Sequence, residues 1–301
     1  MKRFIKNITQ IGWGWIALLA LSTYVMWIPQ FLSDNWLEAV VTAVLTLVNA
    51  VVLMFIAYKT GATHSHSAMP VLMYLLFIGV FAELHFDWQI QVVTIALQTI
   101  IALQIRSYRN NNAVDESFLI GVILALTMLL EPDVIFFLPF VWFGFSWQRA
   151  LNGKVILASI IGMALVALYL TLLVWMQYIC IYSFEEIYKH SWINTSMLPR
   201  LLYVIVWTVF FFVSTAFNFT RANSSVQSYI VLYVLLLPEV LFFSLLQPNK
   251  FSPTTSLLAL SASALATYYF SSKQTMMSRI SFVLFILLSV AISLMTYFGV
   301  L

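Results

Sequence analysis

The sequence predicts an all-α protein that crosses a membrane many times, and three observations support this fold class. Hydrophobic residues make up 62% of the 301 residues and charged residues only 8%, whereas soluble domains usually carry about 25% charged residues. Apolar stretches recur along the whole chain and are separated by short polar segments. These stretches lack the period-two alternation of barrel strands, so helices are the remaining way to satisfy backbone hydrogen bonds in lipid.

Eleven apolar stretches are candidate spans, because a helix needs roughly 20 residues to cross a hydrocarbon core about 30 Å thick. They cover residues 11–31, 37–58, 69–82, 88–105, 117–130, 134–148, 155–178, 201–220, 226–247, 254–270 and 280–300. The third, fifth and sixth are short, and we expect them to be half-inserted or shielded by neighbouring helices. The polar segments are too short for a soluble domain, so residues 1–301 are expected to form a single integral membrane domain.

The orientation follows from Lys and Arg residues, which are retained on the cytoplasmic side of a membrane when they lie in short loops. With the N-terminus inside, eleven of the 14 basic residues lie inside, and the C-terminus lies outside. Nine of the 11 acids, which were not used in this assignment, then lie on or towards the outer side. These nine are Asp34, Glu38, Glu83, Asp87, Glu131, Asp133, Glu185, Glu186 and Glu239. We therefore expect a reaction centre, if the protein has one, to open outward.

Charge and cysteine content narrow the possible partners. The net charge of +3 comes mostly from basic residues that set topology, so nucleic-acid binding is not expected. Membrane lipids are the expected partners of the basic loops. A single cysteine, Cys180, excludes an internal disulfide and a cysteine-based metal cluster.

The first outer loop holds one acid that helix formation does not explain. Asn35 and Glu38 have the spacing of a capping box for the second span, which predicts a helix start. This interpretation gives Asp34 no structural role. A carboxylate at that place is a candidate general base, so Asp34 is the candidate catalytic residue.

The second outer loop contains Glu83, His85 and Asp87. In a helix Glu83 and Asp87 share a face, and in an extended loop all three side chains point the same way. Either conformation offers a pair of oxygen ligands that would suit Mg²⁺ or Mn²⁺. His85 is then a candidate substrate-binding residue. The alternative is a solvated loop whose acids follow the topology alone.

Two further acidic positions are candidates for substrate binding. Glu131 and Asp133 flank Pro132, and a proline at the first helical position with acids beside it is typical of a helix start. Glu239 follows Pro238 about eight residues inside the predicted end of the ninth span. An ionisable group at that depth is costly unless it is paired or faces water, so Glu239 indicates either function or a different span boundary.

The middle of the chain resembles a known superfamily. The run Glu116-Ser117-Phe118-Leu119-Ile120-Gly121-Val122-Ile123-Leu124-Ala125-Leu126 is followed by Leu129-Leu130-Glu131-Pro132, an apolar span, Arg149 and a further apolar span. This pattern is similar to the middle of the GT-C superfamily of membrane glycosyltransferases. Over roughly residues 69–175 the chain also resembles an uncharacterised family of polytopic inner-membrane proteins of Bacteroidetes.

The GT-C resemblance implies transfer of a sugar from a polyprenyl-phosphate donor at the outer face of the inner membrane. Asp34 would deprotonate the acceptor hydroxyl, and the polyprenyl phosphate would leave. A metal ion at Glu83 and Asp87, or an outer basic residue, would balance the charge on the departing phosphate. The three outer basic residues are Lys189, Arg200 and Lys250.

Two other classes of function fit the sequence. In a transporter or lipid flippase, Glu239 and the helix broken near Pro238 would line a path through the bilayer. A non-catalytic subunit of a cell-envelope assembly also fits, because no strong catalytic motif is present. A ligand between Asp34 and the second outer loop would favour the enzyme, and a water-filled passage to Glu239 would favour transport.

Overall fold

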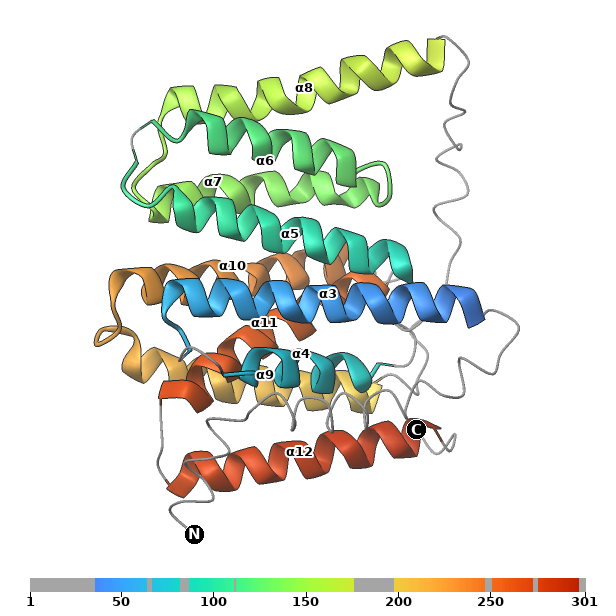
Figure 1. The fold of residues 1–301 in the computed structure, drawn as a ribbon, viewed down its shortest axis with the longest axis vertical. Helices are drawn as coiled ribbons and strands as arrows, with labels where there is room; N and C mark the ends of the chain where they lie inside the picture. Colours follow the sequence, from blue (N-terminus) through green and yellow to red (C-terminus); the bar gives the residue numbers. More distant parts are fainter. Residues whose placement is uncertain are drawn as a thin grey trace.

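The computed structural model describes residues 36–63, 67–81, 87–110, 112–175, 198–246, 251–272 and 276–297. Within these ranges the chain forms ten α-helices, one 3-10 helix and no strand, so the predicted all-α class is confirmed (Figure 1). The elements are α3 (Trp36–Thr60), α4 (Met69–Gly79), α5 (Trp88–Arg106), α6 (Val114–Thr127), η2 (Pro132–Phe136), α7 (Phe137–Trp147), α8 (Gly153–Trp175), α9 (Leu198–Phe219), α10 (Ser224–Leu246), α11 (Phe251–Ser272) and α12 (Met276–Tyr297).

The helices follow the apolar stretches of the sequence. Ten of the predicted spans coincide with α3 to α12 to within a few residues, and residues 11–31 lie outside the described part. Five helices are long and apolar enough to cross a bilayer, namely Trp36–Thr60, Trp88–Arg106, Gly153–Leu173, Pro199–Phe219 and Met276–Ser293. Three shorter apolar helices cover Met69–Gly79, Pro132–Trp147 and Ser224–Val240. These helices indicate a membrane protein.

Helix α11 is the centre of the bundle. It packs against α10, α4, α9 and α5, and every residue from 255 to 270 is buried. Its buried part is rich in small residues, with Ser256, Ser261 and Ser263 interspersed among alanines. Small side chains let neighbouring backbones approach closely in membrane proteins, so this composition explains how α11 contacts so many helices.

Successive helices run in opposite directions, and this alternation separates the charges (Figure 1). The basic end, as we call it, carries Lys59, Arg106, Arg109, Arg149, Lys154, Arg221 and Arg279. The opposite, acidic end carries Glu38, Asp87, Glu131 and Asp133. Glu116 lies at the basic end, where its carboxylate pairs with Arg106 at 3.6 Å.

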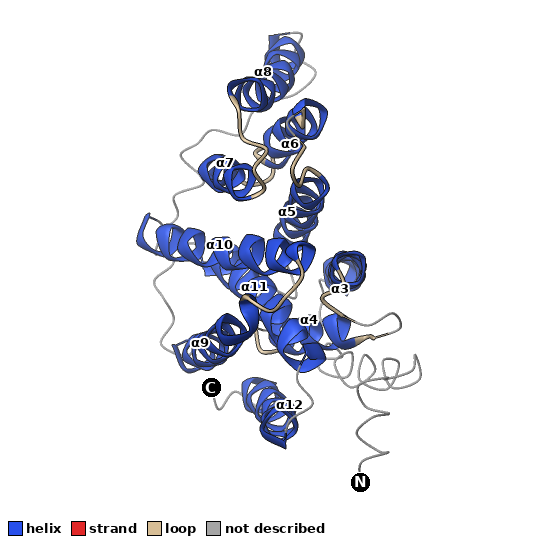
Figure 2. Ribbon diagram, turned by 90° about the vertical axis from the view of Figure 1, so that its left-hand side faces the viewer, coloured by secondary structure: helices blue, strands red, loops and turns tan. Residues whose placement is uncertain are grey.

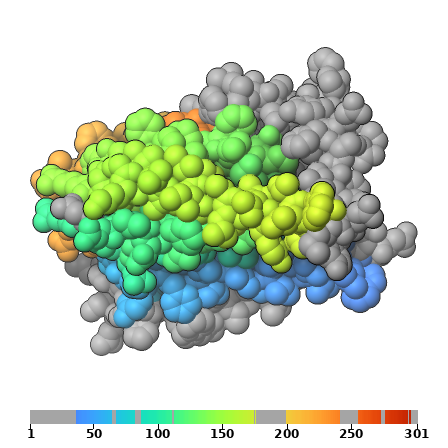
Figure 3. Space-filling view, turned by 90° about the horizontal axis from the view of Figure 1, so that it is seen from above, coloured from blue at the N-terminus to red at the C-terminus, as the bar shows by residue number. Residues whose placement is uncertain are grey.

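Helix α8 lies at one extremity of the bundle and packs mainly against α6 (Figures 1 and 3). The contact is close because two glycines face the opposite backbone. A Cβ atom on Gly121 would lie 2.1 Å from the carbonyl oxygen of Ser159, and one on Gly162 would lie 2.4 Å from that of Phe118. The Ser117 hydroxyl also donates to the Val155 carbonyl at 2.6 Å. The outer face of α8 exposes large apolar side chains such as Leu168, as expected for a helix in contact with lipid.

The orientation of the bundle can be tested with single cysteines. We expect Asn110→Cys, at the basic end, to react with a membrane-impermeant thiol reagent only after the cytoplasmic side is opened. Leu37→Cys, in the first turn of α3 at the acidic end, should react in intact spheroplasts. Both variants need a Cys180→Ser background, because Cys180 is the one native thiol. The reverse pattern would contradict the assignment made from Lys and Arg residues.

Candidate functional site: a cavity at the basic end

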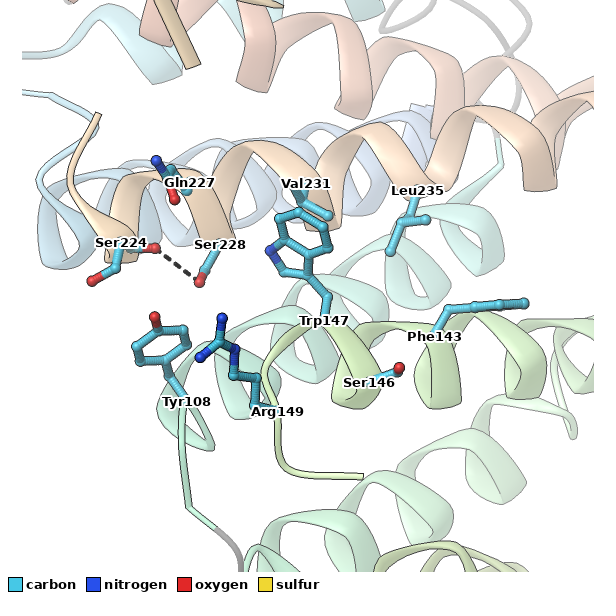
Figure 4. Close-up of a pocket in the computed structure, with 10 residues that line it drawn as sticks. All are labelled: Tyr108, Phe143, Ser146, Trp147, Arg149, Ser224, Gln227, Ser228, Val231 and Leu235. Atoms are coloured by element: carbon cyan, nitrogen blue, oxygen red, sulfur yellow. Dashed lines mark hydrogen bonds between the residues drawn. The ribbon is translucent and has the colours of Figure 1, made fainter. Parts of the chain in front are cut away.

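A cavity of about 420 Å³ lies at the basic end between α7 and α10 (Figure 4). Its walls come from the end of α7, the turn that follows it, the first half of α10 and the turn after α5. The lining residues are Tyr108, Phe143, Ser146, Trp147, Arg149, Ser224, Gln227, Ser228, Val231 and Leu235. None of these lining residues is a carboxylate, and Arg149 contributes the positive charge.

The polar part of the cavity lies at the beginning of α10. The Tyr108 hydroxyl and the Arg149 guanidinium both point toward the first turns of this helix (Figure 4). The Ser228 hydroxyl lies 3.0 Å from the Ser224 carbonyl and 3.0 Å from the side-chain oxygen of Gln148, so it donates to one or the other. A guanidinium beside hydroxyl groups and a helix N-terminus favours a negatively charged ligand, phosphate above all.

The remainder of the cavity is apolar and extends along the helices. Phe143, Trp147, Val231 and Leu235 line it (Figure 4). From Ser224 to Leu235 an α-helix rises about 16 Å, which is roughly half the thickness of a hydrocarbon core. The cavity therefore combines a polar mouth with a wall long enough to face an acyl or isoprenoid chain.

Two arginines at this end occupy an uncommon backbone conformation. Arg109 has φ 56° and Arg149 has φ 57°, and each follows the end of a helix. Left-handed residues are common at helix C-termini, but they are usually glycine or asparagine. The amide of Arg109 donates to the Gln148 carbonyl at 2.9 Å, which ties the two turns together. An arginine at such a position costs free energy, so its side chain is expected to have a use.

The described acids at the acidic end begin helices. The Asp87 side chain accepts a hydrogen bond from the Ile90 amide at 3.2 Å and caps α5. Pro132 and Asp133 lie in the first turn of η2, which confirms the predicted helix start. Glu131 and Asp133 also line a recess of only about 10 Å³. In the described part of the chain, no group of three or more His, Cys, Asp or Glu residues is placed to hold a metal ion.

Of the other predicted site residues, two lie in the described part of the chain and four lie outside it. Arg200 is buried in the first turn of α9. Glu239 lies inside α10 after Pro238, with a half-buried side chain, so the predicted position within a helix is confirmed. The structure does not bring Arg200 or Glu239 into the cavity at the basic end. Asp34, Glu83, His85 and Lys189 lie outside the described residues, so their catalytic, metal-binding and substrate-binding roles stay predictions.

A buried polar cluster, which the sequence reasoning missed, joins α3, α4 and α5. The Asn49 amide donates to the Gln91 side-chain oxygen at 3.0 Å, and the Gln98 amide donates to the Asn49 side-chain oxygen at 3.0 Å. The Tyr74 hydroxyl also donates to Gln91, at 3.3 Å. All four side chains are fully buried. Hydrogen bonds of this kind hold helices together in membranes, so we assign the cluster a structural role.

The cavity residues were also missed, although the sequence carries a faint signal for them. An aromatic residue precedes an arginine in two turns at the basic end, as Tyr108-Arg109 and as Trp147-Gln148-Arg149. Both arginines served the prediction of topology, and Arg149 also marked the basic turn of the GT-C-like pattern. Aromatic residues beside basic residues are typical of the membrane–water interface, where they contact lipid headgroups.

The fold and this cavity indicate a helical membrane protein with several candidate spans and an amphipathic cavity at one end of its bundle. The chain belongs to a family of unknown function, DUF6427, whose model matches residues 6–299. Comparison with curated proteins and with solved structures gave no match.

Proposed function

We propose that this protein binds a membrane lipid with an anionic, phosphate-containing headgroup at its basic end. One observation carries the proposal: a single cavity places the Arg149 guanidinium and several hydroxyl groups at the mouth of an apolar wall. Basic pockets between membrane helices are suited to anionic headgroups. If the basic end faces the cytoplasm, as the distribution of Lys and Arg predicts, the ligand comes from the leaflet that faces the cytoplasm.

The residues of the cavity support binding more directly than they support a reaction. Acid–base chemistry usually needs a carboxylate or histidine near the ligand, and the lining residues include neither. The glycosyl transfer implied by the resemblance depends on Asp34 and on a metal ion at Glu83 and Asp87, and Asp87 lies at the acidic end, opposite this cavity. It shares one requirement with the cavity, because a polyprenyl-phosphate sugar also joins a phosphate to an apolar chain. A transporter or a subunit of an envelope assembly would also be compatible with a bound lipid.

The test measures lipid affinity of the purified protein. Competition between phosphatidylglycerol and phosphatidylcholine for a labelled anionic lipid should show a clear preference for phosphatidylglycerol, and the preference should weaken at high salt. We expect Arg149→Gln to lower the affinity for phosphatidylglycerol by about tenfold, because a charge-assisted hydrogen bond contributes roughly 1.5 kcal/mol or more.

The matched control is Arg109→Gln. Arg109 carries the same charge at the same end and has a similar backbone conformation, but it does not line the cavity. The Arg109→Gln variant should bind phosphatidylglycerol nearly as tightly as the unaltered protein does. Equal losses of affinity in both variants would show that the lipid responds to the overall charge of the basic end and not to the cavity. If the unaltered protein shows no preference for the anionic lipid, the proposal is wrong.

A further inference from the structure

A second cavity, of about 170 Å³, lies on the other side of α10, between α9 and α10. It is almost entirely apolar, with Phe212, Ala216, Phe219, Ile230 and Val234 among its lining residues. Its one polar side chain is Thr215, whose hydroxyl is buried and has no hydrogen-bond partner among the described residues. Such a cavity suits a hydrocarbon chain.

The two cavities adjoin each other at α10. Val231 lines both of them, and α10 lies between α7 and α9 in both views of the fold (Figures 1 and 2). The Trp147 ring lines the first cavity and lies 6.3 Å, centroid to centroid, from the ring of Phe219, which lines the second. The charged mouth at Arg149 therefore opens on one apolar cleft and lies near a second, on the far side of α10.

We infer that the ligand is a lipid with two hydrocarbon chains, one in each cleft, whose phosphate lies near Arg149. This inference rests on the proposed function and specifies its ligand. A single-chain lipid phosphate would fill only the cleft between α7 and α10. A two-chain phospholipid would also fill the cleft between α9 and α10, with Val231 between its chains.

The experiment compares phosphatidylglycerol, which has two chains, with lysophosphatidylglycerol, which has one. Ala216→Phe, on α9, and Val234→Trp, on α10, each fill the second cleft from a different wall. We expect either variant to lower the affinity for phosphatidylglycerol by about fivefold or more, since added volume in an occupied cleft displaces the chain. Affinity for lysophosphatidylglycerol should stay unchanged, which shows that the variants are folded.

The outcomes separate this inference from the proposed function. If both variants bind phosphatidylglycerol as the unaltered protein does, while Arg149→Gln still weakens binding, the two-chain ligand is wrong and the phosphate site stands. If the unaltered protein binds neither anionic lipid in preference to phosphatidylcholine, the phosphate site itself is wrong. Thr215→Val is a further check, because removing the hydroxyl makes the cleft more apolar and should preserve or strengthen binding of the two-chain lipid.

Discussion

Replacing Gly121 with leucine is expected to separate α8 from α6 and to destabilise the protein by about 3 kcal/mol. Even a Cβ atom at this position would lie 2.1 Å from the Ser159 carbonyl oxygen, and a backbone oxygen cannot rotate away as a side chain can. The helices would have to move apart, which also breaks the hydrogen bond from Ser117 to Val155. Because α8 packs mainly against α6, other contacts cannot compensate for this loss.

The prediction is measured as the thermal unfolding midpoint and the monodisperse yield of the protein in mild detergent. Gly121→Ala should also lower the midpoint, although alanine normally stabilises a helix relative to glycine by about 0.5–1 kcal/mol. Gly153→Ala is the matched control, since a Cβ atom there would meet nothing within 4 Å. Equal midpoints for Gly121→Ala and Gly153→Ala would contradict the close packing of α6 and α8.

Much of the fold could be predicted from the sequence because its signals are local. Each helix from α3 to α12 coincides with an apolar stretch. Residues near a helix start also determine where the helix begins: the Asp87 side chain caps α5, and Pro132 lies in the first turn of η2. Because successive helices alternate in direction, most described basic residues lie at one end and most described acids at the other, with Asp115, Glu116 and Arg200 as the exceptions.

The candidate site could not be predicted in the same way, because it depends on which helices become neighbours. Gln148 and Ser228 are 80 residues apart in the chain, yet their side chains are hydrogen-bonded. Hydrophobic periodicity does not show that α7 packs against α10. Likewise, the charge pattern predicts where acids lie and says little about their use: Asp87 lies at the predicted end and serves there as a helix cap.

Replacing Arg149 with glycine is expected to preserve or improve stability while weakening lipid binding by about tenfold or more. At φ 57° an L-residue is strained by roughly 1 kcal/mol and glycine is not, although the greater freedom of glycine in the unfolded chain offsets part of the gain. The unfolding midpoint should therefore stay the same or rise. The affinity for phosphatidylglycerol should fall at least as far as in Arg149→Gln, since glycine also removes the aliphatic part of the side chain from the cavity wall.

The matched variant is Arg109→Gly, because Arg109 shares the left-handed conformation and lies outside the cavity. The Arg109→Gly variant should also have an unchanged or raised unfolding midpoint, although it loses the contact between the Arg109 guanidinium and the Tyr108 ring, which costs a little stability. Its affinity for phosphatidylglycerol should be nearly that of the unaltered protein. An arginine in a conformation that favours glycine is best explained by a role of its side chain. If Arg149→Gly instead lowers the midpoint and leaves lipid binding intact, Arg149 serves the fold, and the cavity loses its principal ligand-binding group.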